Sequence, residues 1–282
     1  MNEGRLTRVL LAFWVLLVLL FLFVPIALIV VYAFNPSNVQ GWPLHGLSTK
    51  WFGQTWHNPD MQAALKLSLK AGVVATSIAL VLGSAAAFAV HRFRFFGREA
   101  VSFLLVLPIA LPGIITGMAL NSFFTFAGWS LSYWTIVIGH ATFCVVIVYN
   151  NVLARLRRTQ TSLIEASMDL GADGWQTFRF VTLPVISTAL IAGGLLAFAL
   201  SFDEVIVTTF TAGAQNTLPL WIFGNIRLGQ QLPQVNVVVL IILAVTILPV
   251  ALAQRLTREA GLLRRTAGVG GAAAQAAQTG AV

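Results

Sequence analysis

The sequence predicts an all-α membrane protein with six transmembrane helices. Hydrophobic residues make up 58% of the 282-residue chain and charged residues only 9%, which excludes an ordinary soluble domain. Apolar runs of about 20 residues, the length that spans a bilayer, recur along the chain. Most basic residues gather in the turns between alternate runs. Together these features predict a bundle of spanning helices joined by short segments.

Each predicted span is read from its apolar run and the breaks that flank it. Arg5 and Arg8 precede the first run, as in a signal peptide, but the run is too long and lacks a convincing cleavage site. We therefore expect a retained first span after a short N-terminal segment, residues 1–8. The six expected spans cover residues 9–32, 66–90, 99–126, 132–154, 185–210 and 235–254.

The connecting segments have their own signals. Residues 34–62 are predicted to be irregular and external, and residues 211–234 to form a second external loop. The third span contains Pro108 and Pro112, then Gly113 and Gly117 at the same spacing, which predicts a kinked helix that a neighbour approaches closely. Trp129, Tyr133 and Trp134 are typical of an aromatic belt at the membrane interface. Residues 266–282 are rich in Ala, Gly and Gln and are expected to be disordered.

The distribution of Lys and Arg predicts the orientation. With six spans, both termini lie on one side, which receives thirteen basic residues against four on the other. The positive-inside rule then places both termini and residues 155–184 in the cytoplasm. The formal charge of +8 therefore reflects topology and not nucleic-acid binding.

Two classes of site are excluded by composition. The single cysteine, Cys144, lies in an apolar run, so neither a disulfide framework nor a thiolate metal cluster is expected. None of the three lysines follows a glycine, so the chain lacks a Gly-Lys-Ser/Thr phosphate loop and is not an ATPase itself.

Residues 155–184 read as a soluble helical hairpin between two spans. Ser162 and Glu165 have capping-box spacing, and Asp173 with Gln176 repeats it more weakly. Gly171 separates the two helices, and Pro184 suits the first turn of the next run. The hairpin carries apolar side chains outside the membrane, so it requires a partner. These are Leu163, Ile164, Met168, Leu170, Trp175 and Phe178.

The sequence Glu165-Ala166-Ser167, then Gly171, then Val181-Thr182-Leu183-Pro184, resembles the EAA loop of ABC importer permeases. It departs from the family pattern at Ser167 and Val181, both mild changes in volume. The resemblance implies the type I ABC importer permease fold and a coupling helix that docks on a cytoplasmic ATPase. The residues that it assigns to coupling are Ser162, Glu165, Ala166, Ser167, Gly171, Ala172, Leu183 and Pro184.

Asp203 and Glu204 are adjacent carboxylates near the outer end of the fifth predicted span. A charge at the bilayer centre costs about 2.5–3.5 kcal/mol on insertion scales, so the pair needs a reason. One is that both reach external water; the other is a polar layer along a transport path, to which Asn121 and His140 would add at similar depth. His140 alone is more typical of a satisfied interior histidine.

Residues 201–213, followed by Thr217-Leu218-Pro219-Leu220, resemble the second permease of spermidine/putrescine importers. This resemblance implies a bacterial inner-membrane subunit that works with a second permease, two ATPase subunits that bind ATP and Mg²⁺, and a periplasmic binding protein. Carboxylates along a path would suit a cationic solute. Permeases for other small solutes share much of the pattern, so the solute stays open.

Two other classes of membrane protein account for part of the sequence. An ion-coupled secondary transporter is also apolar and polytopic, and it typically shows internal repeats and broken helices. The sequence shows no convincing repeat, and such a carrier has no use for a docking hairpin. A membrane scaffold would explain the hairpin but not the carboxylate pair.

Overall fold

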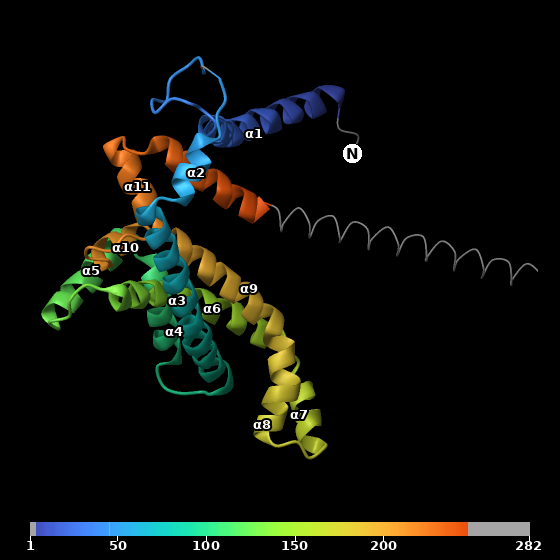
Figure 1. The fold of residues 1–282 in the computed structure, drawn as a ribbon. Coiled ribbons are helices and arrows are strands. Elements are labelled where there is room, and N and C mark those ends of the chain that lie inside the picture. The colour runs from blue at the N-terminus through green and yellow to red at the C-terminus, as the bar shows by residue number, and fades with distance from the viewer. Residues whose placement is uncertain (1–3, 45, 248–282) are drawn as a thin grey trace, which may run out of the picture. The chain divides into compact units, whose positions relative to one another are not determined.

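The structure is a computed structural model that describes residues 4–44 and 46–247, and all regular structure in this part is helical (Figure 1). It comprises two compact units, one from Met1–Thr55 with Gly229–Val282 and one from Trp56–Leu228. The helices are α1 Arg5–Ala33, α2 Lys50–Trp56, α3 Pro59–Arg92, α4 Arg98–Ala110, α5 Gly113–Phe126, α6 Tyr133–Arg158, α7 Thr161–Asp169, α8 Gly174–Thr177, the π-helical turn η1 Phe178–Thr182, α9 Leu183–Asp203, α10 Ile206–Thr211, α11 Leu218–Leu228, and a further apolar helix, Leu232–Ile247.

The first unit contains α1, α2 and the helix Leu232–Ile247. The most apolar 18-residue stretch of α1 has a mean hydropathy of 3.2, and none of it is buried by the described chain. This suits a helix that faces lipid. Ala33, Trp51 and Val237 form a small core. The Trp51 indole nitrogen Nε1 donates to the Asn35 carbonyl at 2.7 Å, which fixes α2 against the end of α1.

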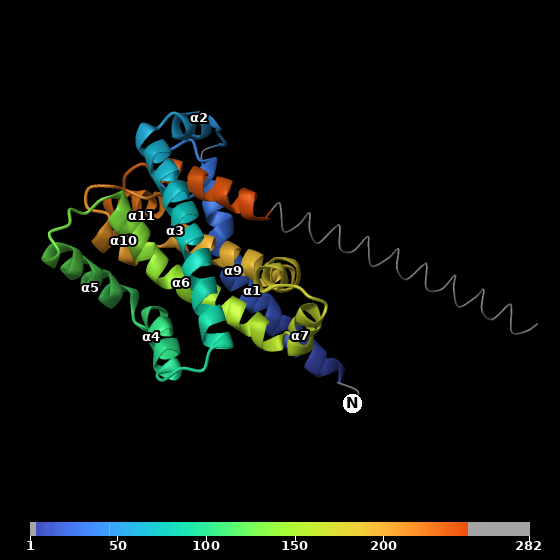
Figure 2. The same ribbon diagram turned by 90° about the horizontal axis from the view of Figure 1, so that it is seen from below.

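The second unit is built on α3, α6 and α9, which pack against one another (Figures 1 and 2). Small residues recur every fourth position along α3 and form the buried face toward α6; they are Ala71, Ala75, Ala79, Gly83 and Ala87. At Gly83 the two backbones touch, because a Cβ there would lie only 2.8 Å from the Val145 carbonyl oxygen. Small residues at this spacing are how apolar helices approach closely without a hydrophobic driving force.

The third predicted span is two helices and not one kinked helix. α4 and α5 are bent by 105° at a short break. Pro112 disfavours helical backbone at Leu111, which is extended (ψ 145°), so the bend occurs here while α4 continues through Pro108. The expected close neighbour is present, because a Cβ at Gly117 would lie 2.6 Å from the Phe210 ring.

The fifth predicted span is also broken. α9 ends at Asp203, Glu204 is extended (ψ 116°), and α10 starts at Ile206. The expectation that Asp203 and Glu204 share one continuous helix is therefore wrong. Residues 34–62, predicted to be irregular, contain α2 and the first turn of α3, and α11 forms within the predicted loop 211–234.

Four helices in the described residues are long and apolar enough to cross a membrane, α1, α3, α6 and the run Gly174–Asp203, or five if α4 and α5 count as one span. The sixth predicted span, 235–254, begins within Leu232–Ile247. Residues 248–254 and the predicted tail, 266–282, lie outside the described residues.

Replacing Gly83 with Ala should destabilise the protein by about 1–3 kcal/mol, because the added methyl collides with backbone atoms of α6 that cannot rotate away. The measurement is thermal unfolding of the detergent-purified protein. The matched control is Gly224→Ala in α11, where nothing lies within 4 Å of the added Cβ. Equal melting temperatures for the two variants would contradict the close approach of α3 and α6.

Candidate functional site

The hairpin between α6 and α9 consists of α7 and α8, and η1 joins it to α9. It lies at the end of α9 opposite to α10 (Figure 1). Gly171 ends α7 with a left-handed backbone (φ +88°). The Gly171 amide donates to Met168 O at 2.9 Å and the Ala172 amide to Ser167 O at 3.1 Å, the bonding pattern of a Schellman motif. The predicted helix break at Gly171 is confirmed.

One of the two predicted caps is confirmed and the other is wrong. Asp173 Oδ1 accepts from the Gln176 amide at 2.7 Å, and Gln176 Oε1 accepts from the Asp173 amide at 2.9 Å, a complete capping box. Ser162 is not an N-cap, because α7 already begins at Thr161 after an extended Gln160. α6 runs on to Arg158, which leaves room for only two linking residues, so α7 starts too early for Ser162 to cap it.

Side chains within the hairpin join its two helices. Ser167 Oγ lies 3.0 Å from Thr177 Oγ1, a contact that an alanine at 167 could not make and that the sequence reading missed. Phe178 stacks on Trp175 with ring centroids 5.6 Å apart and meets Phe88 of α3 edge-on at 5.7 Å. Phe178 therefore belongs to the hairpin's own packing.

The rest of the hairpin's apolar surface is uncovered by the described chain. Large side chains that stay exposed are Leu163, Met168, Leu170 and Trp175, whereas Ile164 is partly buried. Glu165 and Ala166 are also exposed, and Leu183 and Pro184 form the exposed first turn of α9. The predicted coupling residues thus lie on α7, on the turn that follows it and at the start of α9. The exposed apolar side chains beside them form a surface that another protein can bind.

The two carboxylates differ in what they contact. Glu204 is partly buried, and its Oε1 accepts the Val207 amide at 2.8 Å, so it satisfies the first turn of α10. Asp203 is the last residue of α9 and is exposed. A carboxylate beside the free carbonyls of a helix C-terminus adds to their negative potential, which attracts cations. Glu204 is therefore a structural carboxylate, whereas the Asp203 carboxylate is free to bind a ligand.

Asn121 and His140 both bind α10. Asn121 Nδ2 donates to Phe210 O at 2.7 Å, and Thr135 Oγ1 lies 2.7 Å from the next carbonyl oxygen, Thr211 O, and 2.7 Å from Ser132 O. His140 is 1% exposed, with Nδ1 2.7 Å from Ser201 Oγ and Nε2 2.8 Å from Thr208 Oγ1. The structure thus brings all four predicted polar residues to the α9–α10 break and its short helix. Thr135 and Thr208 were missed because threonines in an apolar run are unremarkable in sequence.

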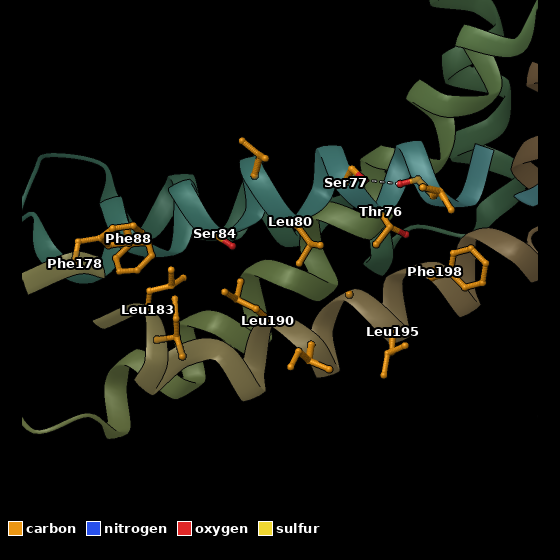
Figure 3. A pocket seen from close by; sticks show the side chains of 15 residues that line it. Thr76, Ser77, Leu80, Ser84, Phe88, Phe178, Leu183, Leu190, Leu195 and Phe198 are labelled. Carbon is orange, nitrogen blue, oxygen red and sulfur yellow. Dashed lines mark hydrogen bonds between the residues drawn. The ribbon is translucent and has the colours of Figure 1, made fainter. Parts of the chain in front are cut away.

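A groove of about 640 Å³ runs between α3 and α9 (Figure 3). Its lining is largely aliphatic and aromatic, with Leu80 of α3 facing Leu190 of α9, and Phe88 and Phe178 at one end. Thr76 and Ser84 contribute buried hydroxyls that have no partner in the described chain. None of the described residues that line the groove is charged, so the groove suits an apolar ligand better than a cation.

No group of three potential metal ligands occurs among the described residues.

Comparison with known proteins adds to this geometry. The family described as "Binding-protein-dependent transport system inner membrane component" matches residues 79–259. This range includes the hairpin and the α9–α10 break.

Named relatives cover most of the chain. The putrescine transport system permease protein PotI of Escherichia coli K12 is 36% identical, over 82% of this chain and 85% of its own. The spermidine/putrescine transport system permease proteins PotC of Shigella flexneri and of Haemophilus influenzae are each 32% identical, over 89% and 85% of this chain and 93% of their own lengths.

Two solved structures share the fold. A bacterial ABC transporter involved in import of the acidic polysaccharide alginate matches with a TM-score of 0.68 at 16% identity, covering 90% of this chain and 99% of the other. The MetNI methionine ABC transporter matches with a TM-score of 0.53 at 17% identity, covering 71% and 93%. The two structures confirm the expected all-α permease fold. The family match and the named relatives confirm the resemblance to ABC importer permeases.

Proposed function

This chain belongs to the family of inner membrane components of binding-protein-dependent transport systems, and we propose that it is a permease subunit of an ATP-driven importer of polyamines. The solute class comes from the putrescine and spermidine in the names of its relatives. Those relatives are transport permeases and not enzymes. The chain would move the cation across the bacterial inner membrane by alternating access.

The observation that carries the importer function is the exposed hairpin. The turn between its two helices is fixed by the bonds at Gly171 and by the Asp173 capping box, so the hairpin is a preformed surface. Leu163, Met168 and Trp175 remain exposed on it. Preformed apolar anchors reduce the ordering cost of binding, which is what docking on an ATPase requires.

The partners follow from the family. The proposed complex contains a second permease, a dimer of ATPase subunits that bind ATP and Mg²⁺, and a periplasmic binding protein that delivers the solute. The Lys and Arg distribution supports a cytoplasmic hairpin and cytoplasmic termini, including residues 1–8 and 266–282. The hairpin then faces the compartment that contains ATP.

The polar layer at the α9–α10 break supports a cationic solute. We assign the direct contact to Asp203, because it is exposed at the end of α9 while Glu204 is used as a cap. Asn121 and His140 complete the layer around α10. The Asp203 carboxylate and the free carbonyls at the end of α9 both attract a cation.

The two broken spans favour one other functional class, the ion-coupled secondary transporter. Breaks of this kind are typical of ion-coupled secondary transporters. The two classes differ in their energy source, so one experiment separates them.

That experiment is uptake of radiolabelled putrescine into proteoliposomes. We expect uptake only when this chain, the second permease, the ATPase and the liganded binding protein are all present, with ATP on the ATPase side. Adding an ionophore should change nothing. Uptake by this chain alone, or uptake driven by an ion gradient without ATP, would show that it is a secondary transporter.

Gly171→Val should uncouple ATP hydrolysis from uptake while the complex still assembles. The space around Gly171 is open, so the defect arises only from the left-handed backbone, which a β-branched residue resists. Gly171→Asn is the matched variant, because Asn tolerates this backbone, and it should retain most coupling. The measurements are binding-protein-stimulated ATPase activity and uptake. Equal losses in both variants would argue that the backbone conformation is irrelevant.

Asp203→Asn should raise the apparent KM for putrescine at least about tenfold, because the cation loses its opposite charge. Glu204→Gln should keep near-parental uptake and melting temperature, since its side-chain carbonyl can still accept the Val207 amide. Glu204→Ala removes a cap worth about 0.5–2 kcal/mol and should lower the melting temperature. Parental uptake by Asp203→Asn would refute the proposed contact.

A further inference from the structure

His140 joins the two sides of the α9–α10 break through its two ring nitrogens. Nδ1 lies 2.7 Å from Ser201 Oγ in the last turn of α9, and Nε2 lies 2.8 Å from Thr208 Oγ1 in α10. Ser201 and Thr208 are both buried. Asp203 lies between these two anchors in the chain, so the imidazole ring fixes the backbone on both sides of it.

The direction of the hydrogen bonds follows from the hydroxyls. Thr208 Oγ1 donates to Glu204 O at 2.7 Å, which uses its one proton. With that proton on Glu204 O, Thr208 Oγ1 accepts from His140 Nε2–H, and Nδ1 accepts from Ser201. The ring is thus the neutral Nε2–H tautomer, assigned from the network. The chain of bonds ends on the peptide carbonyl of Glu204, one residue beyond Asp203.

We propose that His140 is a positioning residue for the solute: it holds the break in the shape that directs the Asp203 carboxylate away from the helices. This proposal rests on the proposed function, in which Asp203 meets the cation. His140 itself is too deeply buried to touch the solute. It acts through the backbone, and a misplacement of about 1 Å is enough to weaken an oriented contact substantially.

The ring is suited to this role because it is rigid and bonds at two opposite edges. Both anchors use their side chains, so each bond can be deleted separately with little change in volume. Removing either bond frees one side of the break and leaves the helices α6, α9 and α10 in place.

The test uses Ser201→Ala and Thr208→Val in the reconstituted importer. We expect each to raise the apparent KM for putrescine by about 3- to 10-fold, with a much smaller change in the maximal uptake rate and in ATP hydrolysis without solute. Ser187→Ala in α9 and Thr209→Val in α10 are matched controls, because each hydroxyl bonds only within its own helix. These controls should leave the KM unchanged.

The decisive measurement repeats both variants in an Asp203→Asn background. If His140 acts through the carboxylate, the rise in KM that Ser201→Ala and Thr208→Val cause should disappear there. The same fold-rise in both backgrounds would show that the histidine only stabilises packing, and no rise in either would show that it positions nothing; both results overturn the proposal. If Asp203→Asn alone leaves the KM unchanged, the carboxylate contact itself fails, and the positioning role fails with it.

Discussion

A helix that breaks in an apolar layer leaves backbone amides and carbonyls without partners, and this constraint organises the described bundle around α10. Glu204 accepts the Val207 amide, Asn121 donates to Phe210 O, and Thr135 Oγ1 lies 2.7 Å from Thr211 O. These side chains come from three different segments. Each one therefore both satisfies a backbone group and ties a neighbouring element to α10, so that α5 and α6 are held to α10 by the same bonds that make the break tolerable.

Polar residues in an apolar run have two possible uses, and their bonding separates them. Asn121 and His140 are engaged with α10, and Glu204 caps it, whereas Asp203 is exposed at the end of α9. A carboxylate next to a helix C-terminus is disfavoured by the partial negative charge of the free carbonyls there. Its cost is explained if a cation occupies the position during transport, which is why the solute contact is assigned to this residue.

The sequence predicted those parts of the fold whose signals are local. Length and apolarity predicted α1, α3 and α6, and the hairpin break follows from Gly171 because few other residues adopt its backbone. The broken spans were missed for tertiary reasons. Pro112 signals a bend, but whether it is a mild kink or 105° depends on how α5 packs on α10. At Glu204 no Pro or Gly marks the break, and the capping bond to Val207 is visible only once the chain has turned.

Broken helices do not separate this chain from an ion-coupled carrier, because two of its predicted spans are broken. What distinguishes the chain is the connection between its two sites. α8 and η1 lead into α9 without an intervening loop, and α9 runs for 21 residues, about 30 Å, to Asp203. His140 holds the far end of this helix. In the proposed function, a displacement of the hairpin by the ATPase is therefore carried along one rigid helix to the carboxylate, which a carrier without a docking partner would not need.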